Sequence, residues 1–181
     1  MSLTKAQLRA EIKTALSKLS DESILKKTFE INLHLQKLIQ KKKLVGAYAP
    51  LKAEPQWPLC DGHESWAFPA VYKNEMVFKK CAFPELVEEK VVGLAIRVPA
   101  VDAQIAVPEI LIIPGLAFSL NGERLGRGRG YYDRYLEHFT GVRIGVCFEE
   151  QLLAKIPCED HDAKMHLIVT EKRVVKIEEK L

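Results

Sequence analysis

Apolar residues recur at helical spacing over the first forty positions of the chain. Within residues 5–19 they fall three or four positions apart, which is the spacing of an amphipathic helix. A second helix of this kind is predicted over residues 21–40, with Ser20 as its N-cap and two acids in its first turn. The lysine run at residues 41–43 follows, where positive charge suits the negative end of the helix dipole. Two helices are therefore expected before the first strand.

Short apolar runs bounded by proline, glycine or asparagine dominate the rest of the chain and are typical of strands. They predict strands at residues 44–49, 65–72, 76–81, 109–113, 143–148, 166–170 and 174–177. Two more helices are predicted, at residues 131–139 and 150–156, and residues 83–99 are expected to be loop with one helical turn. This alternation favours an α/β fold, a three-layer sandwich around a mostly parallel sheet. With no internal repeat and no linker, residues 1–181 are expected to form a single domain.

Composition narrows the class of protein. The chain has 181 residues, 48% of them hydrophobic and 28% charged, which excludes disordered and collagen-like chains. Its first residues lack the apolar core of a signal peptide, and prolines interrupt its most apolar stretch, residues 105–118, which is too short to span a bilayer. The four cysteines, Cys60, Cys81, Cys147 and Cys158, form no C-x-x-C pair. We therefore expect reduced thiols in a cytosolic protein.

The net charge of +3 is unevenly distributed. Residues 1–43 carry a balance of +6, residues 44–118 a balance of −3, and residues 119–181 are neutral. Within that neutral part, residues 124–134 hold four arginines and one aspartate. The two basic patches can serve phosphates, nucleic acid or no ligand at all.

The most informative stretch is rich in glycine and arginine. Five of the ten glycines lie between residues 114 and 135, and three of them alternate with Arg127 and Arg129 ahead of a predicted helix. Glycine lets backbone N–H groups approach an anion, and a helix N-terminus adds partial positive charge. Arginine supplies forked donors that match phosphate oxygens. Together these features predict a polyphosphate site.

Neither standard nucleotide motif accounts for this stretch, since it contains no Walker A loop and no G-x-G-x-x-G. One alternative is a flexible segment that binds RNA loosely. The glycine-rich stretch is short and lies between a predicted buried strand and a predicted amphipathic helix, which favours phosphate binding instead. Asp133 follows the last glycine by three residues, where an acid can either cap the helix or hold Mg²⁺ beside a phosphate. The residues alone leave both roles open.

Residues 114–118 (Pro-Gly-Leu-Ala-Phe) and 122–133 (Gly-x-Arg-Leu-Gly-Arg-Gly-Arg-Gly-Tyr-Tyr-Asp) closely resemble the signature of the 5-formyltetrahydrofolate cyclo-ligase family. The resemblance extends over nearly the whole chain. It includes an N-terminal K-x-x-L-R that begins at Lys5, a first strand and acidic turn at residues 48–54, and a late aspartate in the pair His161-Asp162. It implies a Rossmann-like fold similar to those of NagB, RpiA and the CoA transferases.

The resemblance also implies a reaction. In this family ATP and Mg²⁺ drive closure of 5-formyltetrahydrofolate to 5,10-methenyltetrahydrofolate, with release of ADP and phosphate. The formyl oxygen is phosphorylated first, N10 then attacks the formyl carbon, and phosphate leaves. The expected ligands are thus small molecules, ATP and a folate, and we expect no nucleic acid and no membrane partner. A cytoplasmic monomer is expected.

Roles of single residues follow only from this resemblance. It implies a catalytic role for Arg127, Arg129 and Tyr131. ATP binding is implied for Lys5, Arg9, Arg124, Leu125, Gly126, Arg127, Gly128, Arg129, Gly130, Tyr131 and Tyr132. Folate binding is implied for Ala49, Glu54, Arg127, Gly128, Arg129, Gly130 and Tyr131. The Mg²⁺ ligands implied are Asp133 and Asp162.

The chain departs from the family pattern at four places. Ser119 stands where an aspartate is usual, His166 where an acid is common, and residues 55–57 replace polar and acidic ones. The connection from Glu54 to Trp66 is also short for a parallel crossover. These changes touch the folate side more than the phosphate side. Two alternatives therefore stay open: a divergent member that uses ATP on another N-acyl substrate, and a non-catalytic module that binds a folate, a nucleotide or nucleic acid.

Overall fold

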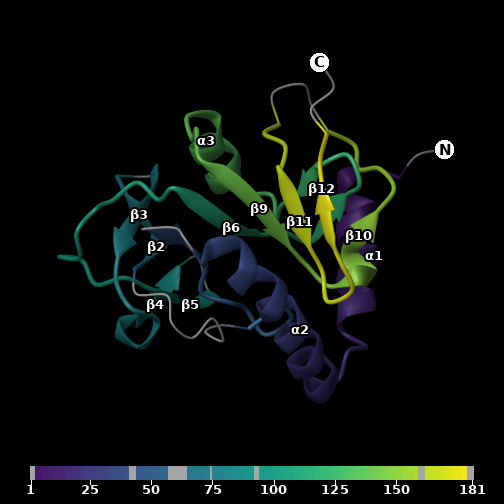
Figure 1. Ribbon diagram of the computed structural model, residues 1–181, viewed down its shortest axis with the longest axis horizontal. Helices are drawn as coiled ribbons and strands as arrows, with labels where there is room; N and C mark the ends of the chain where they lie inside the picture. The colour runs from purple at the N-terminus through teal and green to yellow at the C-terminus, as the bar shows by residue number, and fades with distance from the viewer. Residues whose placement is uncertain are drawn as a thin grey trace.

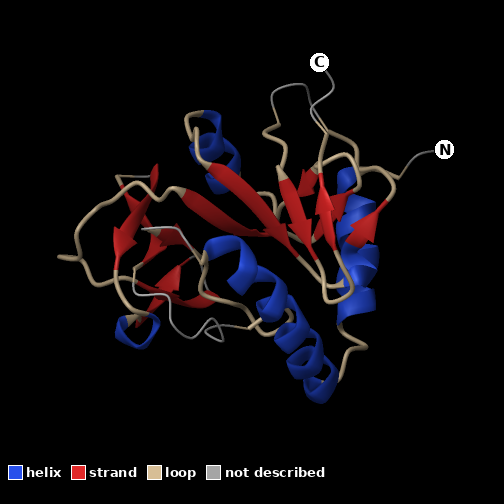
Figure 2. Cartoon of the chain, in the orientation of Figure 1, coloured by secondary structure: helices blue, strands red, loops and turns tan. Residues whose placement is uncertain are grey.

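The computed structural model describes residues 3–40, 44–56, 65–73, 75–91, 94–158 and 162–178. Within these residues the main sheet has seven strands in the order β12-β11-β9-β6-β1-β2-β3 (Figures 1 and 2). Its strands are β1 (Val45–Gly46), β2 (Trp66–Tyr72), β3 (Glu75–Lys80), β6 (Ile110–Pro114), β9 (Val142–Val146), β11 (Leu167–Val169) and β12 (Val174–Lys176). The five inner strands pair in parallel, and the edge strands β3 and β12 pair antiparallel to their neighbours. The predicted mostly parallel sheet is confirmed.

Strand β6 shows why the sheet is covered on both faces. Its Ile110 and Ile112 belong to one buried cluster, shared with the two N-terminal helices. Leu111 and Ile113 belong to a second cluster on the opposite face, shared with α3 (Tyr131–Glu137). Because successive side chains of a strand point to opposite faces, an unbroken apolar run requires cover on both sides. The three-layer arrangement is thus confirmed.

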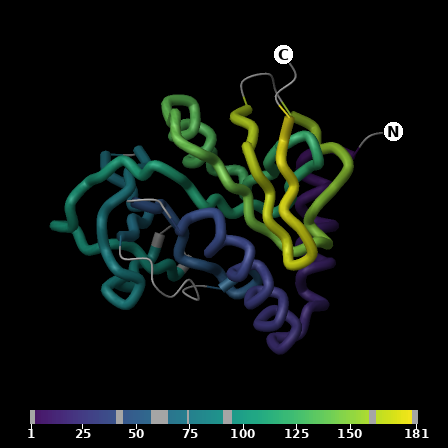
Figure 3. The backbone as a smooth tube through the Cα atoms, viewed as in Figure 1, coloured from purple at the N-terminus to yellow at the C-terminus, as the bar shows by residue number. Residues whose placement is uncertain are grey.

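Both N-terminal helices form where the apolar spacing predicts them. Helix α1 (Lys5–Leu16) begins with a capping box, in which Thr4 accepts the amide of Gln7 and the Gln7 side chain accepts the amide of Thr4. Helix α2 (Asp21–Ile39) begins at Ser20, whose side chain accepts a backbone hydrogen bond as expected. Figure 3 shows α1 at the same end of the molecule as the C-terminal strands. This placement brings the basic N-terminus to the late part of the chain.

The region from residue 83 to residue 99 holds more structure than expected. Its one helical turn is present as the 3₁₀ helix η1 (Phe83–Glu85), but a hairpin of β4 (Val87–Val91) and β5 (Leu94–Val98) replaces the predicted loop. Residues 87–90 of β4 are all exposed. An exposed strand rich in charge carries no apolar alternation, so the sequence pattern could not reveal it.

The predicted helix at residues 150–156 is wrong. The chain forms a 3₁₀ turn, η2 (Glu149–Gln151), and then the short strand β10 (Leu152–Leu153). Strand β10 pairs with β7 (Ala117–Ser119) of the glycine-rich stretch, which in turn pairs with β8 (Arg124–Leu125), and the three form a small second sheet. The Gln151 side chain accepts the amide of Phe148 and donates to two carbonyls just before β7. Pairing with a strand distant in sequence therefore overrides the local helical pattern.

Some expectations fall on residues that the structure does not describe. These are the lysine run at 41–43, most of the crossover at 57–64 with Cys60, the turn at Asn74, and His161. The other three cysteines are free thiols, as predicted. Among the described residues, no helix is both long and apolar enough to cross a membrane.

Candidate functional site

The Gly/Arg loop, residues 124–133, starts on β8 and ends in the first turn of α3. Gly128 has a φ of +95° and Gly130, the N-cap of α3, a φ of +68°. Side chains other than glycine rarely adopt these angles, so the local path of the loop depends on both glycines. Helix α3 has only seven residues, shorter than the predicted 131–139. Attraction of an anion to this loop therefore rests mainly on its arginines and backbone amides.

Helix α1 contacts the Gly/Arg loop directly. Arg9 donates from Nε to the carbonyl oxygen of Gly126 at 2.9 Å, and its guanidinium lies next to Gly128. One turn earlier, Lys5 forms an ion pair with Asp162 at 3.2 Å. Because Lys5 and Arg9 are four residues apart, they share one face of the helix. The two basic patches of the sequence are thus adjacent in space, and the late aspartate lies beside them.

A buried carboxylate holds the middle of the loop. Glu54, only 5% exposed, accepts from Nη2 of Arg127 at 2.7 Å and from its Nε at 3.3 Å. Its second oxygen accepts the amide of Leu51 at 2.9 Å. The Arg127 side chain keeps 42% of its surface exposed. The residue expected on the folate side and an arginine expected on the phosphate side therefore contact each other.

Arg124 holds the end of the loop. Its guanidinium pairs with Asp133 at 2.5 Å, donates to the carbonyl of Pro114 at 3.3 Å, and lies over the Tyr132 ring. The N-terminus of α3 has no side-chain cap. Asp133 is the acid in the first turn of α3, and its carboxylate pairs with Arg124. The Asp133 side chain stays 49% exposed and can accept a further partner.

Tyr132 carries a buried polar atom without a partner. Its hydroxyl is buried and makes no hydrogen bond with the described residues. Burial raises the pKa of Tyr132 well above its usual value; nearby Arg124 lowers it and Glu54 raises it. A buried hydroxyl without a hydrogen bond is costly, typically about 1–3 kcal/mol. A ligand group that reached this hydroxyl would remove that cost, which makes the surroundings of Tyr132 suited to binding.

Of the other residues expected to bind ligands, some pack beneath or beside the loop and others lie at the surface. The Leu125 side chain lies in the core and its carbonyl accepts the amide of Leu116, so it supports the loop from beneath. Ala49 packs partly buried against a small cluster beyond β1. Tyr131 lies under the guanidinium of Arg134, 5.2 Å from it. Arg129 is exposed, and no ion pair holds its guanidinium among the described residues. It is the arginine of the loop most available to a ligand.

The carboxylates expected to bind Mg²⁺ both form ion pairs with protein cations, Asp133 with Arg124 and Asp162 with Lys5. Within the described part of the chain, no three His, Cys, Asp or Glu side chains gather as a metal cluster. Mg²⁺ commonly uses only one or two carboxylates and takes its other ligands from water and substrate phosphates. Two hard oxygen donors beside the Gly/Arg loop fit that mode of coordination. The residues present are therefore compatible with the metal.

Sequence reasoning missed one residue next to the loop. Glu123 is 5% exposed, and its carboxylate accepts hydrogen bonds from Ser119, the amide of Ile156 and Cys158. It occupies the unspecified position of the family pattern, so the resemblance gave it no role. The available signal was the replacement of the usual aspartate at position 119 by serine. A second acid four residues later supplies a carboxylate in the same turn.

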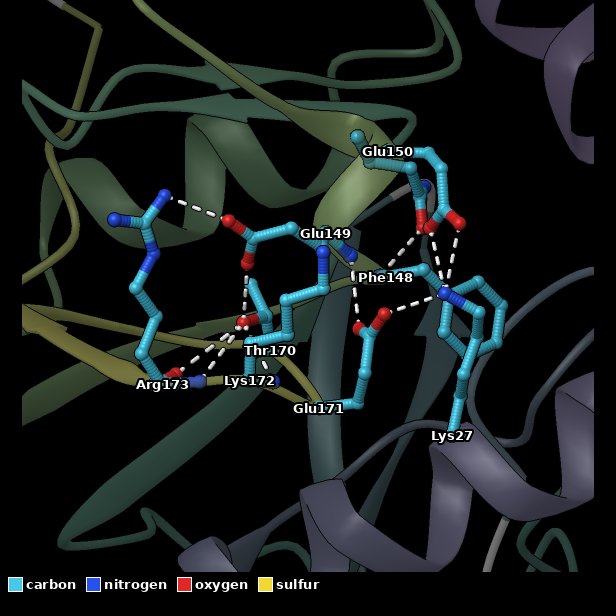
Figure 4. A network of polar contacts seen from close by, with 9 residues as sticks. Lys27, Phe148, Glu149, Glu150, Thr170, Glu171, Lys172 and Arg173 are labelled. Atoms are coloured by element: carbon cyan, nitrogen blue, oxygen red, sulfur yellow. Dashed lines mark hydrogen bonds and ion pairs between the residues drawn. The ribbon is translucent and has the colours of Figure 1, made fainter.

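A second polar cluster, the Lys27 network, lies away from the loop (Figure 4). It joins α2 to the turns after β9 and β11. Lys27 pairs with Glu150 at 2.7 Å and with Glu171, and Arg173 pairs with Glu149 at 2.6 Å. Glu171 also accepts the amide of Glu149. Lys27, Glu149 and Glu171 are each held by two partners, which is typical of a structural contact.

Comparison with known proteins agrees with this geometry. Residues 1–171 match the model of a family described as the 5-formyltetrahydrofolate cyclo-ligase family. The chain is 43% identical over 67 residues to the 5-formyltetrahydrofolate cyclo-ligase of Mycolicibacterium smegmatis, an alignment that covers 36% of this chain and 34% of the relative. It is 35% identical over 88 residues to that of Escherichia coli K12, covering 45% and 48%. The aligned segments thus span less than half of these curated relatives.

A solved structure is similar along nearly the whole chain. The NMR structure of 5,10-methenyltetrahydrofolate synthetase from Aquifex aeolicus superimposes with a TM-score of 0.84 at 28% sequence identity. The match covers 99% of this chain and 95% of that one. The similarity of fold therefore includes the elements that carry the Gly/Arg loop.

Proposed function

Because the chain belongs to the 5-formyltetrahydrofolate cyclo-ligase family, we propose that it closes 5-formyltetrahydrofolate to 5,10-methenyltetrahydrofolate with consumption of ATP. The products are ADP and phosphate. One observation carries the proposal: Lys5 and Arg9 of α1, the Gly/Arg loop and Glu54 converge from distant parts of the sequence. Around one loop lie several cations and three ion pairs that ligands can replace: Lys5–Asp162, Arg124–Asp133 and Arg127–Glu54.

The first half of the reaction suits the cations. The formyl oxygen attacks the γ-phosphorus of ATP, the bond to the β-phosphate oxygen breaks, and ADP leaves. Catalysis of phosphoryl transfer consists mainly of positioning and of neutralising charge. Arg129 is free to bind a phosphate, and Arg127 can do so by exchanging its contact with Glu54. Lys5 and Arg9 would hold the rest of the triphosphate against the loop.

The second half forms the carbon–nitrogen bond. N10 attacks the formyl carbon, which now carries a phosphate as leaving group instead of a poorly leaving oxygen. Departure of phosphate, with loss of the N10 proton, completes the ring. Glu54 would accept hydrogen bonds from the pterin once Arg127 turns to the phosphate, and its burial makes an unpaired carboxylate costly enough to favour such a partner. Tyr131 and the Tyr132 hydroxyl complete the polar wall.

Mg²⁺ would be held by Asp133 and Asp162 together with phosphate oxygens, and when bound it supplies further neutralisation of phosphate charge. In its absence Arg124 and Lys5 occupy these carboxylates. The same cations would remain beside the metal and the nucleotide. The site is therefore arranged to exchange ion pairs within the protein for contacts with its ligands.

Two of the four departures from the family pattern lie in packing contacts. Ser119 donates to Glu123 inside a turn, and His166 accepts the amide of Arg143 at 2.9 Å between β9 and β11. The others lie near Glu54, where the carbonyl of Pro55 accepts from Tyr48 at 3.1 Å, and Trp57 is outside the described residues. This location supports a second candidate, ATP-dependent activation of a related N-acyl substrate.

A coupled assay tests the proposal. Purified protein is incubated with 5-formyltetrahydrofolate, ATP and Mg²⁺, and methenyl absorbance and ADP release are followed together. We expect equal amounts of both products. ATP turnover that 5-formyltetrahydrofolate does not stimulate would favour the second candidate. Binding without turnover would favour a non-catalytic module, and nucleic-acid affinity that disappeared by about 0.2 M salt would indicate only charge attraction.

The proposal extends to the setting of the reaction. The partners are small molecules, and the three free thiols in the described residues fit a reducing cytoplasm. We expect a monomer without membrane or nucleic-acid partners. Light scattering during size-exclusion chromatography would test that state, and a mass near 41 kDa, twice the 20.5 kDa chain, would contradict it.

A further inference from the structure

A tight turn immediately precedes the Gly/Arg loop. It joins β7 to β8, and the amide of Ser119 donates to the carbonyl of Glu123 while the amide of Gly122 donates to the carbonyl of Ser119. Gly122 has a φ of +85°, which closes the turn. The Ser119 hydroxyl also accepts the amides of Asn121 and Glu123. The turn is therefore rigidly defined by its own hydrogen bonds.

The Glu123 carboxylate points from this turn into a buried space. It accepts from the Ser119 hydroxyl at 2.6 Å, from the Ile156 amide at 2.9 Å and from the Cys158 thiol at 3.4 Å. Burial raises the pKa of Glu123, but these hydrogen bonds outweigh burial and leave the pKa below its usual value. None of the ion pairs among the described residues includes Glu123. A hydroxyl, a backbone amide and a thiol thus hold this buried carboxylate in place.

The same turn holds the chain on both sides of Asp162. Glu123 binds Ile156 and Cys158 before it, and the carbonyl of Gly122 accepts the amide of Met165 after it at 2.8 Å. The next residue of the turn, Arg124, pairs with Asp133. Three consecutive residues therefore position the segments that carry both carboxylates expected to bind Mg²⁺.

We propose that Glu123 is a positioning residue for the metal site: its carboxylate fixes Ile156 and Cys158, which precede Asp162 in the chain, relative to the Arg124 end of the loop. This inference rests on the proposed function, because it takes Asp162 as a ligand of Mg²⁺. Residues that orient metal ligands from behind typically change metal affinity or activity about 10–100-fold when they are removed. Glu123 itself, buried and saturated by three donors, would not touch the metal.

The variant Glu123→Gln tests the inference in the full-length protein, since it keeps the size of the side chain and removes its charge. We expect the Mg²⁺ concentration for half-maximal turnover to rise about 10-fold or more, with kcat at saturating Mg²⁺ changed by less than about threefold. In ligand-free protein, we expect faster alkylation of Cys158 by N-ethylmaleimide, followed by mass spectrometry of its peptide. Loss of the Glu123 hydrogen bond frees that thiol.

Glu150→Gln is the matched control. Glu150 is also a carboxylate with a lowered pKa, caused by its contacts with Lys27 against the effect of burial, but it belongs to the Lys27 network. The same chemical change there should leave both the Mg²⁺ dependence and the alkylation of Cys158 as in the wild type. A similar shift in this control would overturn the specific role of Glu123.

The outcomes separate this inference from the proposed function. If the wild type turns over and Glu123→Gln keeps the wild-type Mg²⁺ dependence, the inference is overturned, whatever happens to thermal stability. If the wild type shows no turnover, the proposed function fails, and calorimetry of ATP binding with and without Mg²⁺ decides instead. Equal Mg²⁺ dependence in wild type and variant would then refute the role of Glu123.

A second variant covers the case in which Glu123→Gln does not fold. Ser119→Ala removes one of the three donors to the carboxylate and keeps its charge and its contact with Ile156. We expect a smaller rise in the Mg²⁺ requirement, about threefold, because the segment is held less firmly. No change in that variant would also contradict the inference.

Discussion

The Gly/Arg loop and the Lys27 network both contain ion pairs between a basic and an acidic side chain, but the pairs differ in exposure and in number of partners. In the Lys27 network, Lys27 contacts two glutamates, and Glu171 also accepts the amide of Glu149 (Figure 4). In the loop, Arg127 and Asp133 each form an ion pair with a single partner among the described residues, and both side chains are more than 40% exposed. Multiple partners fix a charge in place. An exposed charge with a single partner can exchange that partner for a phosphate or a metal.

The comparison predicts that the two regions separate activity from stability. Exposed charges that bind a ligand contribute little to the stability of the fold, because exposed ion pairs contribute about 0–1 kcal/mol. Charges saturated within the protein add more, because removing one leaves partly buried partners unsatisfied.

The largest effect is expected in the loop. Asp133→Ala or Arg127→Ala should lower turnover by about 100-fold or more, since each removes a group that neutralises or positions the phosphates. Asp133→Ala removes an exposed side chain and should change the free energy of unfolding by less than about 1 kcal/mol. Arg127→Ala leaves the buried carboxylate of Glu54 without its cation and should cost about 1–3 kcal/mol. Methenyl formation and urea unfolding would be measured together. Normal activity in either variant would refute the roles assigned here.

The Lys27 network should behave in the opposite way. Lys27→Met removes the cation from Glu150 and from Glu171, whose side chain is only 9% exposed. We expect a loss of about 1–3 kcal/mol in the free energy of unfolding, with turnover within about twofold. Lys26→Met, the same change at the exposed neighbouring position, is the control and should be neutral. A large loss of turnover in Lys27→Met would remove the distinction between the regions.

A smaller effect is expected from the backbone of the loop. At Gly128 an alanine side chain would meet no close atom, the nearest being in Arg9 at 3.8 Å, but the φ of +95° strains any residue with a side chain. Gly128→Ala should cost about 1–2 kcal/mol, either as lost stability or as weaker ATP binding if the loop relaxes. Urea unfolding and ATP titration measure the two parts. No change in either would show that the loop does not require this conformation.

The smallest effect concerns acid pH. Contacts with Lys27 lower the pKa of Glu150 although burial raises it, so the ionised form stabilises the fold. That contribution is complete above a pH of about 4.5 and is lost as the pH falls through the lower folded pKa. Glu150→Gln should therefore lower the urea midpoint at pH 7 and flatten its decline between about pH 5 and 3. An unchanged acid decline would mean that Glu150 does not contribute to it.

Local pattern determined much of this protein. The apolar spacing of residues 5–19 and 21–40 is enough to predict two helices, because an amphipathic face is recognisable within a few helical turns. The unbroken run at Ile110–Pro114 likewise indicates a strand covered on both faces. The glycine and arginine alternation, with its resemblance to one family, located the loop and most of its candidate ligands.

Only the tertiary structure decided which residues far apart in the sequence contact each other. Glu54 meets Arg127 across 73 positions and Lys5 meets Asp162 across 157, and no periodicity encodes such pairs. The strand at Leu152–Leu153 in place of the predicted helix and the burial of Glu123 have the same cause. Short segments take their conformation from the surfaces they pack against, and those surfaces exist only once the chain has folded.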